Sequence, residues 1–122
     1  MEFNIRQGAT SPLLKLRLVD DGKNDKSSFN DALENSIITF NMYDYKTGEP
    51  QVLNGECFIT SRTKKYDQTT DEYYIIYKFK EDDTSKIGKF EAMITIDFLD
   101  DNQDPDSKLI LPLKEKLFIN VF

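Results

Sequence analysis

The sequence contains no histidine and no tryptophan, and it has a single cysteine, Cys57. The absence of histidine removes the most common general base and the most common neutral metal ligand, so Ser-His-Asp and Cys-His triads are excluded. One cysteine cannot form a disulfide within the chain, and it cannot supply the several ligands of a structural zinc site. We therefore interpret Cys57 as a small apolar residue of the core.

Glycine is also scarce, because the five glycines stand singly at predicted turns and form no phosphate-binding loop. The 22 acidic residues could in principle include a catalytic pair of carboxylates, but no feature of the sequence marks such a pair as buried. We therefore predict a binding protein that is not an enzyme and needs no cofactor.

Long apolar runs are absent as well. No segment approaches the roughly 18 consecutive apolar residues of a membrane-spanning helix, and the first residues lack the pattern of a secretion signal. The net charge of -6 creates a field that repels phosphate backbones and anionic lipids, so we expect neither nucleic acid nor a membrane as partner. A length of 122 residues predicts one domain, residues 1–122, with one core.

Apolar and polar residues alternate along most of the chain, which is typical of strands with one buried face. The clearest case is Lys89–Leu99, where an apolar residue occupies every second position from Phe90 to Phe98. Seven further strands are predicted by the same criterion, at residues 2–7, 14–18, 37–43, 55–61, 72–80, 109–113 and 117–121. The facing of residues 55–61 stays open, because Cys57, Phe58 and Ile59 are all apolar.

About eight short strands separated by turn residues are typical of a β-sandwich. We therefore predict an all-β fold, an immunoglobulin-like antiparallel β-sandwich of about eight strands. Pro112 removes one hydrogen-bond donor, which indicates an edge or a bulge between the last two strands. The polar residues 20–35 could hold one or two turns of helix, with Ser28 as the cap.

Three polar residues near the C-terminal end have the spacing of a calcium loop. Asp100, Asn102 and Asp104 match its opening D-x-N-x-D pattern. Pro105 stands where the loop needs glycine, and Leu111 stands where it needs a bidentate glutamate. We interpret the segment as an acidic hairpin turn and predict no metal site.

A short basic segment, residues 62–66, stands out in this acidic chain. Such a segment could steer an acidic partner, although ordinary solvated hairpin turns have the same composition. An exposed first strand would add main-chain hydrogen-bonding groups. The predicted partner interface therefore consists of Phe3, Ile5, Arg62, Lys64, Lys65 and Tyr66.

Several tyrosines are clustered in the sequence, at positions 43, 45, 73, 74 and 77. Exposed aromatic rings on a β-sandwich can stack on pyranose rings, so carbohydrate binding is the alternative to protein docking. The alternation of residues 72–80 instead favours a core or sheet-to-sheet position for most of these rings.

Segments at both ends of the chain are similar to a known family. Phe3–Leu13 (FNIRQGATSPL), Leu16–Gly22 (LRLVDDG) and Phe40–Met42 resemble the opening strands of the immunoglobulin-like N-terminal module of phage upper baseplate proteins. Residues 83–92 and Phe98 resemble a second part of that module. There a turn and a glycine precede a strand with an aromatic and a small residue, and a phenylalanine closes the strand.

The resemblance implies a structural protein of a phage virion, assembled in the host cytoplasm. Such a protein would be a docking, adaptor or decoration module in a baseplate, tail or head-fibre assembly, and its partners would be other virion proteins in many copies. No catalytic residue is implied. The residues that would determine the fold are Gly8, Pro12, Gly88, Phe90, Ala92 and Phe98.

Overall fold

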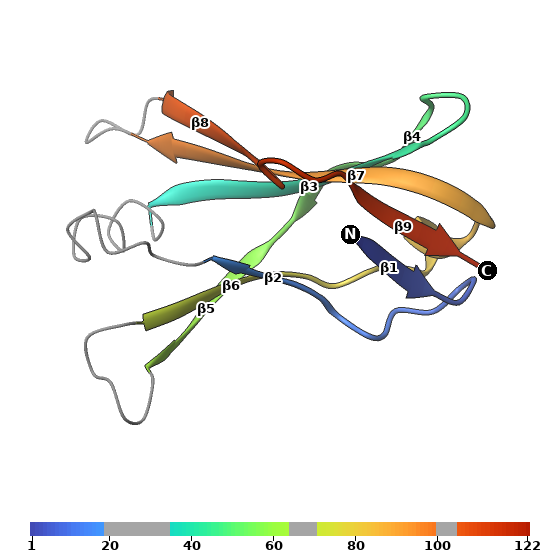
Figure 1. Ribbon diagram of the computed structural model, residues 1–122, viewed down its shortest axis with the longest axis horizontal. Helices are drawn as coiled ribbons and strands as arrows, with labels where there is room; N and C mark the ends of the chain where they lie inside the picture. Colours follow the sequence, from blue (N-terminus) through green and yellow to red (C-terminus); the bar gives the residue numbers. More distant parts are fainter. Residues whose placement is uncertain (19–34, 64–70, 100–104) are drawn as a thin grey trace.

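The computed structural model describes residues 1–18, 35–63, 71–99 and 105–122 (Figure 1). These residues form nine strands and one 3₁₀ turn, η1 (Glu81–Thr84). The strands are β1 (Glu2–Ile5), β2 (Leu14–Leu18), β3 (Ser36–Asp44), β4 (Pro50–Glu56), β5 (Phe58–Thr63), β6 (Asp71–Tyr77), β7 (Gly88–Leu99), β8 (Pro105–Leu111) and β9 (Leu117–Val121). The helical turns expected within residues 20–35 fall outside the described residues. None of the described segments is a helix long and apolar enough to cross a membrane.

The strands form two sheets that pack face to face. The larger sheet has the order β1-β9-β7-β3-β4, with β8 also paired to β7, and the smaller sheet has the order β2-β6-β5. Figure 1 shows the small sheet as the lower layer and the β3, β7 and β8 strands as the upper layer. The prediction of an all-β sandwich is therefore confirmed.

The strand order follows the immunoglobulin pattern. The small sheet corresponds to strands B, E and D of that pattern, and the β9-β7-β3-β4 part of the large sheet corresponds to G, F, C and C′. β9 pairs with the first half of β7 and β8 with the second half, so the two together occupy the place of one strand. The Leu111–Pro112 peptide bond between them is cis. Pro112 thus lies between the last two strands, as expected, and the ninth strand arises from β4 and β5, where a single strand was predicted.

One pair departs from the expected antiparallel arrangement. β1 runs parallel to β9, with Glu2 opposite Phe118 and Ile5 opposite Val121. β9 has β7 on its other side, so β1 covers an edge that would otherwise be open. After Ile5 the chain passes through the Gly8 turn and the cis Ser11–Pro12 bond into the small sheet. Gly8 has φ 76°, a left-handed conformation that favours glycine, in agreement with the bend predicted there.

The segment around Cys57 differs most from the sequence prediction. A single strand was expected over residues 55–61, but β4 ends at Glu56 in the large sheet and β5 begins at Phe58 in the small sheet. Cys57 lies at the crossover, where its backbone N–H donates to the carbonyl of Ile38. A strand that changes sheets also changes the direction of its inward side, so consecutive apolar residues at this point do not indicate one buried face.

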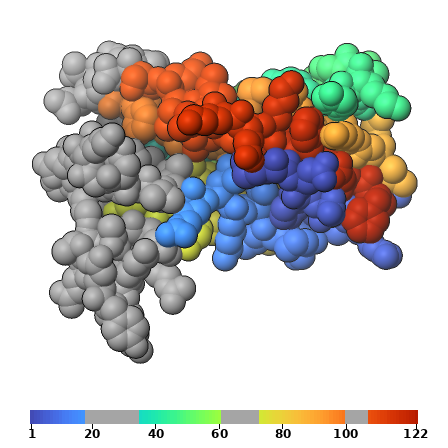
Figure 2. Space-filling view, in the orientation of Figure 1, coloured from blue at the N-terminus to red at the C-terminus, as the bar shows by residue number. Residues whose placement is uncertain are grey.

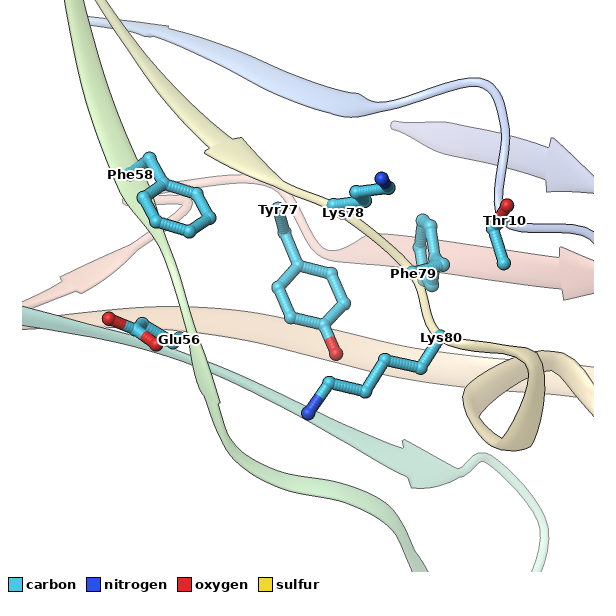
Figure 3. A pocket seen from close by; sticks show the side chains of 7 residues that line it. All are labelled: Thr10, Glu56, Phe58, Tyr77, Lys78, Phe79 and Lys80. Carbon is cyan, nitrogen blue, oxygen red and sulfur yellow. The ribbon is translucent and has the colours of Figure 1, made fainter.

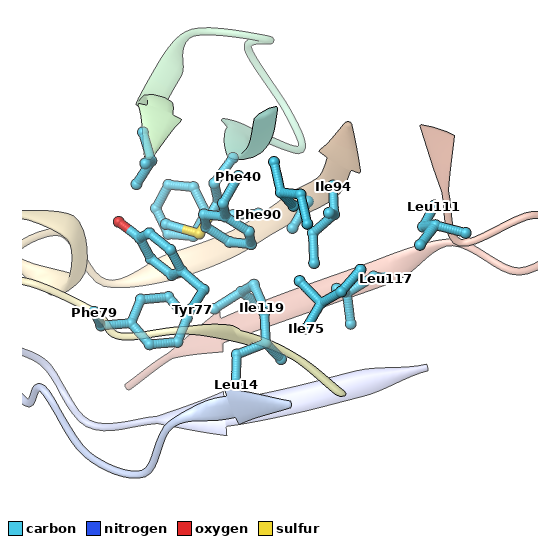
Figure 4. Close-up of a cluster of buried hydrophobic side chains, with 14 of the residues drawn as sticks. Leu14, Phe40, Ile75, Tyr77, Phe79, Phe90, Ile94, Leu111, Leu117 and Ile119 are labelled. Atoms are coloured by element: carbon cyan, nitrogen blue, oxygen red, sulfur yellow. The ribbon is translucent and has the colours of Figure 1, made fainter. Parts of the chain in front are cut away.

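The core lies between the two sheets (Figure 4). On the central strands the alternate side chains of one face are buried: Ile38, Phe40 and Met42 on β3, Tyr73, Ile75 and Tyr77 on β6, and Phe90, Ala92, Ile94 and Ile96 on β7. The β7 residues are the ones whose alternation predicted one buried face. Phe98, the expected end of this series, is only partly buried and packs against the margin of the core. Gly88, at φ 153°, begins β7 as the resemblance implied.

Candidate functional site

An open pocket lies beside the β4–β5 crossover (Figure 3). Its volume is about 440 Å³, and its lining consists of Thr10, Glu56, Phe58, Tyr77, Lys78, Phe79 and Lys80. Most of the lining comes from the extended chain that continues β6. The first residue of β5, Phe58, is opposite Ile76, so β5 provides no neighbour for the chain beyond Tyr77. The pocket opens where this pairing ends.

Gly55 makes room for one wall of the pocket. A Cβ atom at position 55 would lie 2.6 Å from a ring carbon of Tyr77, which is closer than real Cβ contacts. Phe40 is directly opposite Gly55 on β3, and its ring stacks on Tyr77 with centroids 4.2 Å apart. Tyr77 of the small sheet is thereby inserted against the large sheet. The only sequence signal for this contact is an isolated glycine near a strand end, which indicates close backbone approach but not the partner.

The phenol of Tyr77 is held by the loop that follows β6. Its hydroxyl donates to the Asp83 carboxylate at 2.5 Å, and the backbone N–H of Lys80 donates to the same oxygen at 2.9 Å. Burial raises the pKa of Tyr77, and the hydrogen bond to Asp83 and the charge of that carboxylate raise it further. The phenol therefore stays protonated at neutral pH and remains a donor, so this pair satisfies buried polar groups.

The rim of the pocket is charged and its walls are aromatic. Lys78, Lys80 and Glu56 are exposed, while the Phe58 ring is 54% exposed beside them. In Figure 3, Phe58 and Glu56 lie on one side of Tyr77, and Phe79 lies on the other. Two lysines and one glutamate give the rim a positive balance in a chain of net charge -6. Such a lining suits an apolar group that has a negative charge next to it.

The described residues contain no group of three or more potential metal ligands among histidine, cysteine, aspartate and glutamate. Asp100, Asn102 and Asp104, the incomplete calcium pattern, lie outside the described residues. Cys57 is a free, half-buried thiol, and burial raises its pKa to about 12. A thiol with that pKa is almost entirely protonated at neutral pH and is a poor nucleophile.

The predicted partner-interface residues are not gathered in one place. Ile5 is 2% exposed and belongs to the core, because β1 turns that side chain inward, so only the main chain of β1 could contribute to the predicted interface at this position. Phe3 is half-buried and stacks on Phe79, behind the pocket, with ring centroids 5.7 Å apart. Arg62 lies on β5, opposite Glu72 of β6. Lys64, Lys65 and Tyr66 fall outside the described residues.

The tyrosines considered for carbohydrate binding do not share one surface either. Tyr73 is 7% exposed in the core, and Tyr74 points to the opposite side of β6. Tyr45 lies after β3 at the other sheet, where it is 53% exposed and meets Phe118 edge to face at 5.4 Å. The Lys89 ammonium lies over both of these rings.

Comparison of the chain with models of protein families, with curated proteins and with solved structures gave no match. The pocket therefore has to be interpreted from its own chemistry. It combines exposed aromatic surface with lysine ammonium groups and a main chain that lacks a neighbouring strand, and it contains no nucleophile paired with a base. This combination of exposed aromatic surface, cations and unpaired main chain suits the binding of a protein segment.

Proposed function

We propose that this protein is a structural component of a phage virion, where it serves as a docking, adaptor or decoration module in a baseplate, tail or head-fibre assembly. The observation that carries the proposal is the sequence resemblance in segments 3–13, 16–22, 40–42 and 83–92 and at Phe98. Most of the residues in these segments lie in β1, β2, β3, η1 and β7. The similar segments therefore follow the framework of the sandwich, which is what a shared fold requires.

The candidate site supports a docking role within that proposal. Aromatic side chains are enriched at the centres of protein interfaces, and Phe58 offers an exposed ring next to the pocket. β4 and β5 each have a paired strand on one side only in the described part of the chain. Such edges can accept a strand from a neighbouring subunit through main-chain hydrogen bonds.

The test is the protein content of purified particles. Virions would be purified by density gradient, and each protein would be quantified by mass spectrometry relative to the major capsid protein. We expect this chain at a fixed, integral ratio across gradient fractions, while contaminating host proteins vary from fraction to fraction. Absence from the particles, or a ratio that follows the host proteins, would refute the virion assignment.

Carbohydrate binding is the second candidate, and the exposed Tyr45 is the observation in its favour. Tyr45 and Phe118 could stack on a sugar only with the ring surface that Lys89 leaves open. A glycan array with the wild-type chain, Tyr45→Ala and the control Tyr74→Ala separates the two candidates. Binding that Tyr45→Ala alone abolishes would favour the carbohydrate function over docking.

A further inference from the structure

The outer face of the small sheet has an unusual composition. Pairing between strands places Lys15, Ile76 and Phe58 in one row across β2, β6 and β5, and it places Arg17, Tyr74 and Thr60 in the next. Lys78 follows Ile76 two residues later on the same side of the chain. We call these residues the basic face: Lys15, Arg17, Phe58, Thr60, Tyr74, Ile76 and Lys78.

The residues that alternate with those of the basic face are buried, so the basic face points away from the core. Leu14, Ile75 and Tyr77 point into the core, so the residues between them on the same strands point away from it. Lys15 and Lys78 are exposed, and Ile76 is half-buried. In Figure 2 the light-blue residues that lead into and form β2 lie at the surface next to β1.

The charged residues of these two rows and Lys78 are all cations, although the whole chain has a net charge of -6, and the first acidic position on this side of β6 is Glu72, in the next row opposite Arg62. Within the described residues, neither Lys15 nor Lys78 lies within ion-pair distance of a carboxylate. Apolar surface lies between these cations, because Phe58 is 54% exposed and Ile76 is its neighbour across the sheet. Adjacent strands are about 4.8 Å apart, so one row is about 10 Å long, which about three residues of an extended peptide would span.

The basic face is continuous with the pocket. Phe58 and Lys78 belong to both, so an apolar group that enters the pocket passes along the Phe58 ring. β5 forms the nearest sheet edge, with β6 on one side only among the described residues. A segment that reaches both Phe58 of β5 and Lys15 of β2 therefore crosses the three strands on the outer side of the sheet.

We propose that the basic face binds an acidic protein segment in extended conformation, in which carboxylates alternate with apolar or aromatic side chains. The carboxylates would pair with Lys15 and Lys78, and an apolar side chain would cover Phe58 and Ile76. Charge complementarity selects this partner, because a protein of net charge -6 repels long polyanions but can accept a few carboxylates at a local basic surface. The inference deepens the docking part of the proposed function and does not depend on the virion assignment.

The first experiment uses the full chain, labelled with ¹⁵N, and a short synthetic peptide that alternates glutamate with valine and phenylalanine. We expect amide shift changes concentrated at Lys15, Phe58, Ile76 and Lys78, and weaker binding at higher ionic strength. The same peptide with glutamine in place of glutamate should bind at least about tenfold more weakly, because it loses the charge pairing.

Two double variants make the test specific. Lys15→Glu with Lys78→Glu reverses the charge of the basic face, and Lys46→Glu with Lys114→Glu makes the same change in net charge at exposed sites elsewhere. The first should weaken peptide binding at least about tenfold, and the second should change it by less than about threefold. Circular dichroism and thermal unfolding of both variants would verify that each still folds.

Several results would overturn the inference. These are no shift changes at millimolar peptide, shift changes confined to the large sheet, an equal loss in both double variants, or tighter binding to single-stranded DNA or to phosphatidylserine vesicles than to the peptide. A chain that binds the peptide but is absent from virions would refute only the virion assignment. A chain present in virions that fails every peptide test would refute only the inference about the basic face.

Discussion

The outer faces of the two sheets differ in whether their lysines have partners within the protein. On the large sheet, Lys108 lies 3.8 Å from Asp97 and Lys116 lies 3.8 Å from Glu91, while Lys89 lies over aromatic rings. On the small sheet, the cations Lys15 and Lys78 have no carboxylate at ion-pair distance among the described residues. The large sheet therefore neutralises its own surface, and the small sheet presents a surface that a partner could neutralise. Net charge alone would have hidden this difference.

The interior distinguishes the sheets in a second way. β7 of the large sheet pairs with β3, β8 and β9, and its inward residues Ile94 and Ile96 are fully buried. The small sheet packs on this framework through β6, chiefly through Ile75 and Tyr77. We therefore expect stability to depend most on the large-sheet core, and binding to depend most on the outer side of the small sheet.

The largest expected change in the free energy of unfolding tests whether stability depends more on the large-sheet core than on the outer side of the small sheet. Ile94→Ala removes a side chain that is 0% exposed, and we expect it to lower the free energy of unfolding by about 2–5 kcal/mol. Ile76→Ala removes the same atoms from the outer, half-buried side of β6, and we expect a cost below about 1.5 kcal/mol. Urea unfolding of both variants measures the difference. Equal costs would show that the two sheets do not differ in this way.

The contact that joins the sheets should give the next largest effect. Gly55→Ala would place a methyl group against the Tyr77 ring, and overpacking of this kind costs about 1–3 kcal/mol. Because this cost arises from contact with the Tyr77 ring, Gly55→Ala should lower the free energy of unfolding by less in a Tyr77→Leu background. A double-mutant cycle by chemical denaturation measures this coupling. If Gly55→Ala costs the same in both backgrounds, the close approach of Tyr77 is not its cause.

Some strands of the two sheets could be predicted from the sequence and others could not. β7 was predicted with its inward residues, because it has one buried face and a strict period of two. β6 was predicted as a strand without its inward side, because apolar or aromatic residues occupy both of its faces. Alternation failed over residues 55–61, since β4 and β5 belong to different sheets and the inward direction changes at Cys57. The strand Pro50–Glu56 was missed in large part, because its own pattern is short and mostly polar.

The candidate site could be predicted only in fragments. Sequence reasoning identified the basic segment 62–66 because its cations are adjacent along the chain. The basic face combines Lys15 of β2 with Lys78 after β6. These residues come together through the pairing register of β2 and β6, which belongs to the tertiary structure and is not visible in the local sequence. The pocket likewise needs the place where β5 stops pairing with β6, which no local pattern reports. Alternation over residues 2–7 predicted a strand, but it did not show that the Ile5 side chain faces the core.

Alkaline pH should loosen the junction between the sheets. Burial raises the pKa of Cys57 to about 12, and burial with the Asp83 hydrogen bond raises the pKa of Tyr77. Both groups are neutral in the fold, and in the unfolded chain they ionise from about pH 9 upward. The unfolded state therefore releases protons first, so the contribution of these two groups to the free energy of unfolding is constant below about pH 9 and decreases as pH rises from there toward 12.

Two variants test whether Cys57 and Tyr77, at the junction between the sheets, cause the decrease in the free energy of unfolding above pH 9. Cys57→Ala and Tyr77→Phe each remove one titrating group, so each should flatten the decrease in a series of urea titrations above pH 9, even though each also lowers stability at neutral pH. Lys114→Ala, at an exposed site between β8 and β9, should leave the decrease unchanged. A slope that neither Cys57→Ala nor Tyr77→Phe alters would place the alkaline transition elsewhere in the molecule.

The smallest expected effect returns to the two outer faces. Lys108 and Asp97 are both partly exposed, so a double-mutant cycle should give a coupling of only about 0.2–1 kcal/mol, which decreases as salt is added. Lys15→Ala should change the free energy of unfolding by no more than about 0.5 kcal/mol, because that cation has no carboxylate at ion-pair distance among the described residues. If Lys15→Ala destabilised the fold more than Lys108→Ala, the small sheet would already satisfy its own charges. The physical reason to expect an acidic partner there would then disappear.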